Sequence, residues 1–318
     1  MKKIFIAVFL ILCLVPSLGM LITGPGKGGA NEILAAAPEF GADFLNQCSD
    51  YIADRFAFRQ ELITAWAKLN AGVLNTSVEK QVILGKDGEL YYAADYTEAL
   101  NDDELEQIAQ NIKKLQAEAE SGGARFIFTI APDKSSKFPQ MLPDSYGPKN
   151  GNASRLEKYL TEYEINYVNL FEQEIPYYKT DSHWTNVGAA VAADALIGSE
   201  YSKGGFYISG KHTGDLYEML YPALKDNEDE LSYAPGFSYT CEKNPRGGEA
   251  MTIHTFNEAK SGKLYCWRDS FGISLYPYLA DSFGEAVFSR STDYNIAEAG
   301  DSDIIILEIV ERNIGNLK

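Results

Sequence analysis

The feature that most constrains the fold is a regular alternation of short β-rich runs and helical patterns in the middle and at the end of the chain. β-rich runs are found at 125–130, 166–170, 263–267, 286–289 and 304–309, and helical patterns at 101–121, 153–163, 186–197 and 273–279. The last run is nearly all β-branched residues or Leu, as is typical of a strand buried on both faces. Alternation of this kind predicts an α/β fold in which a parallel sheet is covered by helices on both faces.

The segments outside this alternation suggest one large domain with additions. Apolar residues at helical spacing predict two helices over 40–69, joined near 54–56, and 82–92 predicts a hairpin with its turn at 85–88. Residues 200–260 are rich in Gly, Tyr and Pro, and we expect an irregular insertion with weak hairpins over one end of the sheet. The predicted catalytic domain therefore covers 39–318 and includes this insertion.

The N-terminus has the pattern of an export segment. Lys2 and Lys3 precede an apolar run from Ile4 to Val15, and apolar character resumes at 20–22. Residues 1–23 are therefore a signal peptide or a membrane anchor, and the sequence leaves both open. The Gly- and Ala-rich residues 24–38 predict a flexible tether. We expect the domain to lie outside the cytoplasm, either secreted or anchored to the outer face of the cytoplasmic membrane.

Charge and cysteine content narrow the classes of ligand. Acidic residues outnumber basic ones by 45 to 28 and no basic stripe is present, so nucleic acid is not expected as a partner. No three-ligand metal spacing or phosphate-binding glycine loop is found, so we predict neither a metal nor a cofactor. An exported chain permits a disulfide, for which Cys241 and Cys266 are the best pair. Free thiols at Cys48, Cys241 and Cys266 are the favoured alternative.

Polar residues follow the predicted strands at the edge where α/β sheets bind their ligands. These residues are Asp133 and Lys134, the run 180–185, the run 268–270, and Glu311 and Arg312. Because the carboxyl ends of parallel strands meet at one edge, we expect these side chains to converge there.

Ser270 is the candidate nucleophile of this edge. It lies where a strand turns into a helix, and a serine at neutral pH needs a neighbouring base to attack a carbonyl group. The chain has only 3 histidines, and His183 is preceded by Asp181. The combination predicts a triad with Ser270 as nucleophile, His183 as base and Asp181 as orienting acid. Taken singly, the serine is equally compatible with a helix cap and the Asp-x-His with a packing pair.

The Asp-Ser-Phe-Gly string of 269–272 is repeated at 281–284. Ser282, however, follows the helical pattern 273–279 and precedes the strand 286–289. It should therefore lie at the amino end of the sheet, and we favour Ser270.

Five further residues are candidates for substrate or oxyanion contacts: Arg312, Lys134, Trp184, Asp215 and Asp269. Four of them have a structural alternative. The two cations pair with neighbouring carboxylates, Trp184 packs in the core, and the 212–216 segment that contains Asp215 forms a turn. The backbone N–H of Ser270 is a further candidate for the oxyanion site.

Several motifs resemble those of alginate O-acetyltransferases and the related DHHW-type bacterial proteins. Thr180-Asp181-Ser182-His183-Trp184-Thr185-Asn186-Val187-Gly188 resembles their Asp-x-His-Trp signature. Other segments also resemble segments of that family and occur in the same order along the chain: 54–59, 83–88, 131–134, 269–272 and 311–313. Two positions depart from the pattern: Arg268 stands where a glycine is usual, and Ser182 where the DHHW group has a further histidine.

This resemblance implies an SGNH-hydrolase-like domain of three α/β/α layers in permuted order, with the Asp-x-His element before the serine. It also implies acetylation of polysaccharide hydroxyls outside the cytoplasmic membrane, with acetyl supplied by a membrane-bound O-acyltransferase. Two alternatives stay open on the sequence: a carbohydrate acetylesterase with the same triad, and a glycan-binding protein without catalytic activity.

Overall fold

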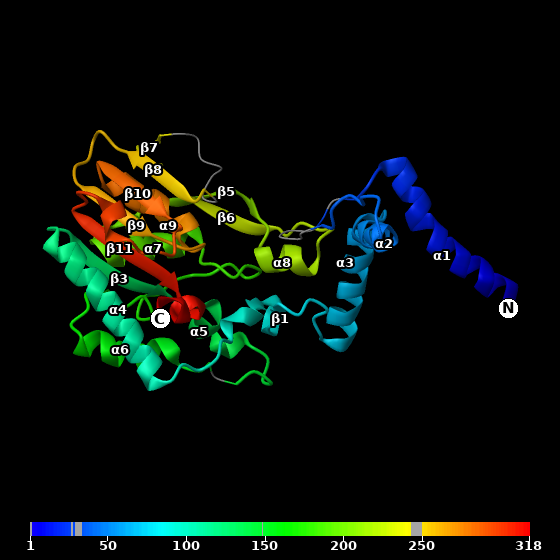
Figure 1. Ribbon diagram of the computed structural model, residues 1–318, viewed down its shortest axis with the longest axis horizontal. Coiled ribbons are helices and arrows are strands. Elements are labelled where there is room, and N and C mark those ends of the chain that lie inside the picture. Colours follow the sequence, from blue (N-terminus) through cyan, green and yellow to red (C-terminus); the bar gives the residue numbers. More distant parts are fainter. Residues whose placement is uncertain (1, 27, 29–33, 148, 243–249) are drawn as a thin grey trace.

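The computed structural model describes residues 2–26, 28, 34–147, 149–242 and 250–318. Its centre is a seven-stranded sheet of order β4-β3-β11-β9-β10-β8-β7 (Figure 1). The strands are β3 (Arg125–Ala131), β4 (Tyr167–Val168), β7 (Thr240–Cys241), β8 (Thr252–Phe256), β9 (Lys263–Trp267), β10 (Glu285–Ser289) and β11 (Ile304–Val310). The five strands from β4 to β10 are parallel, whereas β8 pairs antiparallel with β10 at one edge and β7 pairs antiparallel with β8.

Helices cover both faces of this sheet. In β3, Phe126 and Phe128 face one core, with α4 (Asp102–Ser121) and α6 (Asn152–Glu162) packed on it. Ile127 and Ala131 face the other core, with α7 (Asn186–Ile197) and α9 (Gly272–Ser282). This alternation is the two-residue period of a strand buried on both faces. The predicted three-layer α/β/α architecture is confirmed.

Local signals placed several element boundaries correctly. At the start of α4, the Asn101 side chain accepts from the Glu104 N–H at 2.9 Å, and the Glu104 carboxylate accepts from the Asn101 N–H at 2.9 Å. This reciprocal capping box fixes the first turn. At the other end, Gly122 caps the helix, as expected from the Gly pair.

The segments before the sheet also follow the prediction. Two helices, α2 (Phe44–Arg55) and α3 (Arg59–Leu69), are followed by the antiparallel pair β1 (Val82–Leu84) and β2 (Leu90–Tyr92). Ala67 of α3 joins a small apolar cluster with this hairpin and with α8 (Asp215–Leu220). Ahead of them, α1 (Lys2–Thr23) is long and apolar enough to cross a membrane.

The remaining short elements connect these layers. They are η1 (Asn70–Leu74), η2 (Lys86–Gly88), η3 (Ala93–Asp95), α5 (Lys134–Lys137), η4 (Pro139–Met141), η5 (Tyr201–Lys203), β5 (Phe206–His212), β6 (Glu228–Tyr233), η7 (Ile296–Ala299) and η8 (Glu311–Leu317).

The 200–260 range is more regular than its composition indicated. β5 and β6 form a separate antiparallel pair, while β7 and β8 extend the main sheet. Residues 243–249 of this range lie outside the described residues.

The proposed Cys241–Cys266 disulfide is wrong, because both residues are free thiols, as is Cys48. Cys241 lies on β7 and Cys266 on β9, with β8 and β10 between them. Three strand spacings amount to about 14 Å, twice the roughly 7 Å that a disulfide spans between Cα atoms.

Candidate active site

The turn that carries Ser270 joins β9 to α9 and is tied to the neighbouring strand. The Asp269 carboxylate accepts from the Phe271 N–H at 2.9 Å and from the Val310 N–H at 2.6 Å. The Asp269 N–H in turn donates to the Glu308 side chain of β11 at 3.1 Å. Asp269 thus shapes the turn, and these bonds place Ser270 just before the N-terminus of α9.

Glu308 is a component of this turn that the sequence analysis missed. It is fully buried, and burial together with the neighbouring Asp269 raises its pKa well above the usual range. Both effects favour the neutral form of this carboxyl group. The available signal was one acidic residue inside the otherwise apolar strand 304–310.

The Asp-x-His-Trp segment is fixed to α9 through Trp184. Its indole N–H donates to the Phe271 carbonyl at 3.1 Å and lies 2.9 Å from Ser274 Oγ. The indole also packs edge-on against the Phe271 ring at 4.9 Å. Trp184 is 1% exposed, so it packs in the core, and the alternative of stacking on a sugar ring is not available to it.

The glycine of the same motif is required by a close backbone approach. A Cβ atom at Gly188 would lie 2.5 Å from the Pro176 carbonyl oxygen. The Thr185 hydroxyl caps α7 by accepting from the Gly188 N–H at 3.1 Å. Together these contacts hold the start of α7 against the loop before the Asp-x-His segment.

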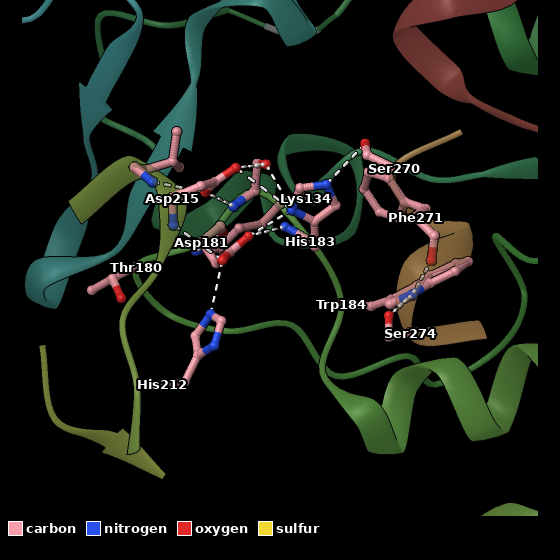
Figure 2. A network of polar contacts seen from close by, with 12 residues as sticks. Lys134, Thr180, Asp181, His183, Trp184, His212, Asp215, Ser270, Phe271 and Ser274 are labelled. Atoms are coloured by element: carbon pink, nitrogen blue, oxygen red, sulfur yellow. Dashed lines mark hydrogen bonds and ion pairs between the residues drawn. The ribbon is translucent and has the colours of Figure 1, made fainter. Parts of the chain in front are cut away.

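The structure brings Ser270, His183 and Asp181 into one hydrogen-bonded chain. Ser270 Oγ lies 3.0 Å from His183 Nε2, and His183 Nδ1 lies 2.7 Å from Asp181 Oδ1 (Figure 2). The His183 backbone N–H also donates to Asp181 Oδ1 at 2.9 Å. These distances and this order are those of a nucleophile, a base and an orienting acid.

Asp181 receives two further hydrogen bonds on its second oxygen. His212 Nε2 lies 2.8 Å from Asp181 Oδ2, and the Asp215 N–H donates to the same oxygen at 3.1 Å (Figure 2). His212 itself stacks on Tyr178 at a centroid distance of 3.9 Å. The sequence analysis gave His212 no part in the triad, and its position at the end of β5 explains why no local motif connects it to Asp181.

These contacts set the charges of the site. Burial alone would raise the pKa of Asp181, but the hydrogen bonds from His183 and His212 hold that pKa well below its usual range. Burial lowers the pKa of His183, and the hydrogen bond to the Asp181 carboxylate outweighs it and raises the pKa. An anionic Asp181 therefore stabilises the imidazolium form of His183, as the acid of a triad does.

Ser182 and Asp215 form a second layer beside the histidine. The Ser182 N–H and hydroxyl donate to the Asp215 carboxylate at 2.8 and 2.6 Å. Asp215 Oδ2 lies 3.5 Å from His183 Nδ1, and burial with the nearby Asp181 charge raises the pKa of Asp215. Asp215 thus supports the triad from the start of α8.

Asp181, His183 and Asp215 also place ligand atoms within 4.8 Å of one another, a separation compatible with a cation. His183 Nδ1 and Asp181 Oδ1 are already joined by their 2.7 Å hydrogen bond. A metal at this point would have to replace that bond, so the donor set fits a hydrogen-bonded His–Asp pair better.

Lys134 points into the protein rather than toward a substrate. Its ammonium group is 1% exposed, pairs with Glu89 at 2.8 Å, and donates to the Leu90 and Lys179 carbonyls at 2.9 and 2.6 Å. It therefore holds the hairpin against the loop that leads to Asp181, and we assign it a positioning role instead of the substrate contact considered above.

Arg312 lies in the wall of the cleft with a carboxylate behind it. Its Nη1 donates to Asp133 Oδ1 at 2.6 Å, so Arg312 is paired with a carboxylate, as in the structural alternative, but with Asp133 and not with its neighbour Glu311. The guanidinium group lies over the Phe271 and Tyr92 rings at 5.5 and 5.3 Å. Arg312 is thus held rigidly near the Ser270 turn.

The triad opens into a cleft of about 850 Å³. The lining residues include Ser182, His183, Asp215, Ser270, Arg290 and Arg312 from the main domain, and Arg59, Gln60 and Ile63 from α3. A second hollow of about 660 Å³ is lined by Tyr217, Tyr221 and the β1–β2 turn. Since that hollow contains no member of the triad, the first one is the candidate active site.

Ser282 lies at the opposite end of the sheet, as the sequence predicted. Its hydroxyl donates to the Tyr278 carbonyl at 2.9 Å and lies 2.9 Å from the Tyr201 hydroxyl. Arg125 and Ile304, at the starts of β3 and β11, line the same surface hollow. Ser282 therefore has no access to His183.

Comparison with known proteins agrees with this geometry. The family described as "SGNH hydrolase-like domain, acetyltransferase AlgX" matches residues 82–207. This chain has an SGNH hydrolase-like domain. The match contains Asp181 and His183 and ends before Ser270, which the fold supplies from the second half of the sheet.

Individual relatives show the same resemblance. Over 158 residues the chain is 25% identical to the probable alginate O-acetylase AlgJ of Pseudomonas syringae pv. tomato, a match that covers 45% of this chain. The matched region spans 39% of that relative's length. The predicted resemblance to alginate O-acetyltransferases is confirmed.

Two solved structures share the fold. Bacillus cereus PatB1 superposes with a TM-score of 0.60 at 18% identity, covering 74% of this chain and 98% of PatB1. A DHHW family protein from Eubacterium siraeum superposes with a TM-score of 0.53 at 17% identity, covering 72% of this chain and 89% of the other.

Proposed function

We propose that this protein is a serine-dependent O-acetyltransferase that acetylates hydroxyl groups of a cell-surface or extracellular polysaccharide. The observation that carries the proposal is the continuous chain Ser270–His183–Asp181, with separations of 3.0 and 2.7 Å, at the mouth of a cleft of about 850 Å³. The resemblance to the alginate O-acetylase supports acetyl as the transferred group and a polysaccharide as the acceptor.

The reaction takes place in two half-reactions at one serine. Ser270 Oγ attacks the carbonyl carbon of an acetyl ester or thioester, while His183 Nε2 accepts the hydroxyl proton. The imidazolium then returns that proton to the leaving group as its bond to the acetyl carbon breaks, which leaves acetyl-Ser270. A sugar hydroxyl, deprotonated by His183, attacks this ester, and Ser270 departs with the proton.

The oxyanion of each tetrahedral intermediate needs hydrogen-bond donors near Ser270. The Ser270 N–H and the first amides of α9 are suited to this role, since the free N–H groups at a helix N-terminus attract negative charge. Arg312 adds a fixed positive charge to the same wall of the cleft. One oxyanion donor is typically responsible for about 100- to 1000-fold in rate.

The location of the reaction follows from the N-terminus. Residues 1–23 serve as a signal peptide or anchor, 24–38 as a tether, and the catalytic domain works outside the cytoplasmic membrane. A membrane-bound O-acyltransferase would supply the acetyl group from the membrane side, and the length and apolar character of α1 support a location at that membrane.

The first test measures acetate release from a chromogenic acetyl ester by the detergent-purified full chain. Wild type should turn over the ester, Ser270→Ala and His183→Ala should not, and Ser282→Ala should retain activity. Equal activity in wild type and Ser270→Ala would contradict the catalytic role and favour a glycan-binding protein.

A second assay separates a transferase from an esterase. The acetyl ester is incubated with an oligosaccharide acceptor, and acetylated sugar and free acetate are measured together by mass spectrometry. We expect sugar acetate to dominate at millimolar acceptor. If free acetate is the sole product at every acceptor concentration, the protein is an acetylesterase instead.

A further inference from the structure

The outer side of α3 carries a stripe of exposed apolar side chains. Leu62, Trp66 and Leu69 are spaced by four and three residues, which places them on one side of the helix. Val73 and Leu74 continue the apolar surface on η1. More than half of each of these five side chains is exposed, with Trp66 at 58% and Val73 at 71%. In water a contiguous apolar surface of this kind is unfavourable and is typical of an interaction site.

The neighbouring helix α2 is exposed to an even greater extent. None of its 12 residues is buried, and Leu45 and Ile52 lie exposed on it. A helix of this length without tertiary packing is only marginally stable in water. Both helices therefore lack the surface that would cover their apolar sides within the described residues.

The position of α1 indicates what that surface is. The Ala57 N–H, at the junction of α2 and α3, donates to the Pro16 carbonyl of α1 at 3.3 Å, and the backbone of Gly19 packs against the Ala57 side chain. From Pro16 to the end of α1 at Thr23 there are seven residues, or about 10 Å of helix. Amphipathic helices that lie in a membrane surface bury their apolar side to a depth of about 5–10 Å.

We propose that the exposed apolar side of α2, α3 and η1 lies in the outer interfacial layer of the membrane that α1 crosses. In Figure 1 these helices form the end of the molecule from which α1 extends, away from the sheet. Trp66 would sit at the level of the headgroups, where tryptophan is favoured. With a net charge of −17 and no basic run, the attachment depends on apolar burial rather than on attraction to anionic lipid.

This placement has a consequence that goes beyond the proposed function. Arg59, Gln60 and Ile63 of α3 line the catalytic cleft, while Leu62 and Trp66 of the same helix face outward. The membrane surface would then lie next to the cleft. An acyl donor held at that surface would therefore be close to Ser270.

The chain offers its own spectroscopic probe for this proposal. It has 3 tryptophans, and Trp184 and Trp267 are buried in the main domain, whereas Trp66 is exposed on α3. The full chain is reconstituted into phosphatidylcholine vesicles with and without brominated acyl chains, which quench only tryptophans in contact with lipid. We expect wild-type fluorescence to fall by about the share contributed by Trp66, and the Trp66→Phe variant to show no such fall.

A matched control places a tryptophan on a different exposed apolar residue. Ile208 belongs to β5 and is 59% exposed. In Figure 1, β5 is separated from α2 and α3. The Trp66→Phe, Ile208→Trp variant should be insensitive to brominated lipid. Equal fluorescence of wild type in both kinds of vesicle would overturn the proposal. The apolar side of α3 would then face water or a protein partner. Quenching of Trp66→Phe or of the Ile208→Trp control to the same extent as wild type would overturn it too, because contact would not be specific to α3.

Discussion

The two ends of α9 carry the same four residues, Asp-Ser-Phe-Gly, in opposite settings. At 269–272 the string enters the helix, and Ser270 lies 3.0 Å from His183 Nε2. At 281–284 the string leaves the helix, and Ser282 donates to the Tyr278 carbonyl one turn back. The hydroxyl groups are chemically identical, so only their surroundings separate a candidate nucleophile from a structural serine.

The aspartates differ in the same way. Asp269 accepts from the backbone of the turn and of β11, and so orders the serine next to it. Asp281 instead accepts from Ser238 and Asn257 and so holds these two residues at the end of α9. In addition, the N-terminus of a helix favours a developing negative charge and its C-terminus opposes one. An oxyanion would therefore be stabilised beside Ser270 and destabilised beside Ser282.

The largest difference in activity between Ser270 and Ser282 should come from the base, His183. His183→Ala leaves Ser270 without a proton acceptor, and we expect ester turnover to fall by about 10⁴-fold or more. Steady-state rates with a chromogenic acetyl ester measure this. A loss of less than tenfold would mean that the serine near His183 is no more activated than Ser282.

Asp181 should determine how ester turnover depends on pH. Because the Asp181 carboxylate raises the pKa of His183, the base is neutral only above the usual histidine range, and activity should rise with pH through a value above 6.5. Asp181→Asn removes that carboxylate, so we expect the acidic limb to move to lower pH while the plateau falls by about 10⁴-fold. An unmoved limb in the variant would show that Asp181 does not set the protonation of His183.

The buried contacts of Lys134 should contribute measurably to the free energy of unfolding. Lys134→Met leaves Glu89 and the Leu90 and Lys179 carbonyls without their buried cation. Breaking a buried pair in this way typically costs about 3–5 kcal/mol, and we expect a loss of about 3 kcal/mol in urea unfolding. The surface pair Lys203–Glu200 gives the control, since Lys203→Met should change stability by less than about 1 kcal/mol.

His212 should contribute less than His183, since Asp181 is the one triad member to which it is hydrogen-bonded in the described residues. His212→Phe keeps the ring on Tyr178 but removes the donor to Asp181 Oδ2, and we expect about a tenfold loss in turnover with an altered pH limb. His212→Gln restores a donor and should recover most of the activity. If both variants lose activity equally, the ring rather than its hydrogen bond is required.

The smallest effect belongs to the other end of α9. Ser282→Ala removes a hydroxyl that bonds the Tyr278 carbonyl and contacts Tyr201, far from the cleft. We expect acetyl-ester turnover within about twofold of wild type and a change in unfolding free energy of about 1 kcal/mol. A catalytic loss comparable to that of His183→Ala would reverse the assignment of the two serines.

Features with local causes were the ones that sequence alone predicted. The capping box at Asn101 and Glu104 and the apolar run 304–309 each depend on neighbouring residues, and both elements were placed within a residue or two. The proximity of Ser270, His183 and Asp181 was also predictable, because strand ends of a parallel sheet meet at one edge and few histidines compete.

What the sequence did not predict depends on contacts between distant segments. β8 joins the sheet by pairing with β10, which is separated from it along the chain by β9 and α9. His212 reaches Asp181 across a separate hairpin, and Lys134 reaches Glu89 only once the β1–β2 pair has folded against the sheet. A motif records which residues are present, but not which partners the fold brings to them.

The most direct test of the central claim is to identify the residue that becomes covalently modified. The full chain is incubated with a sulfonyl fluoride that reacts with activated serines, digested, and mapped by tandem mass spectrometry; His183→Ala serves as the matched control. The account predicts a single adduct on Ser270 that is lost in His183→Ala, with Ser282 unmodified in both. An adduct on Ser282, or equal labelling of Ser270 without His183, would contradict it.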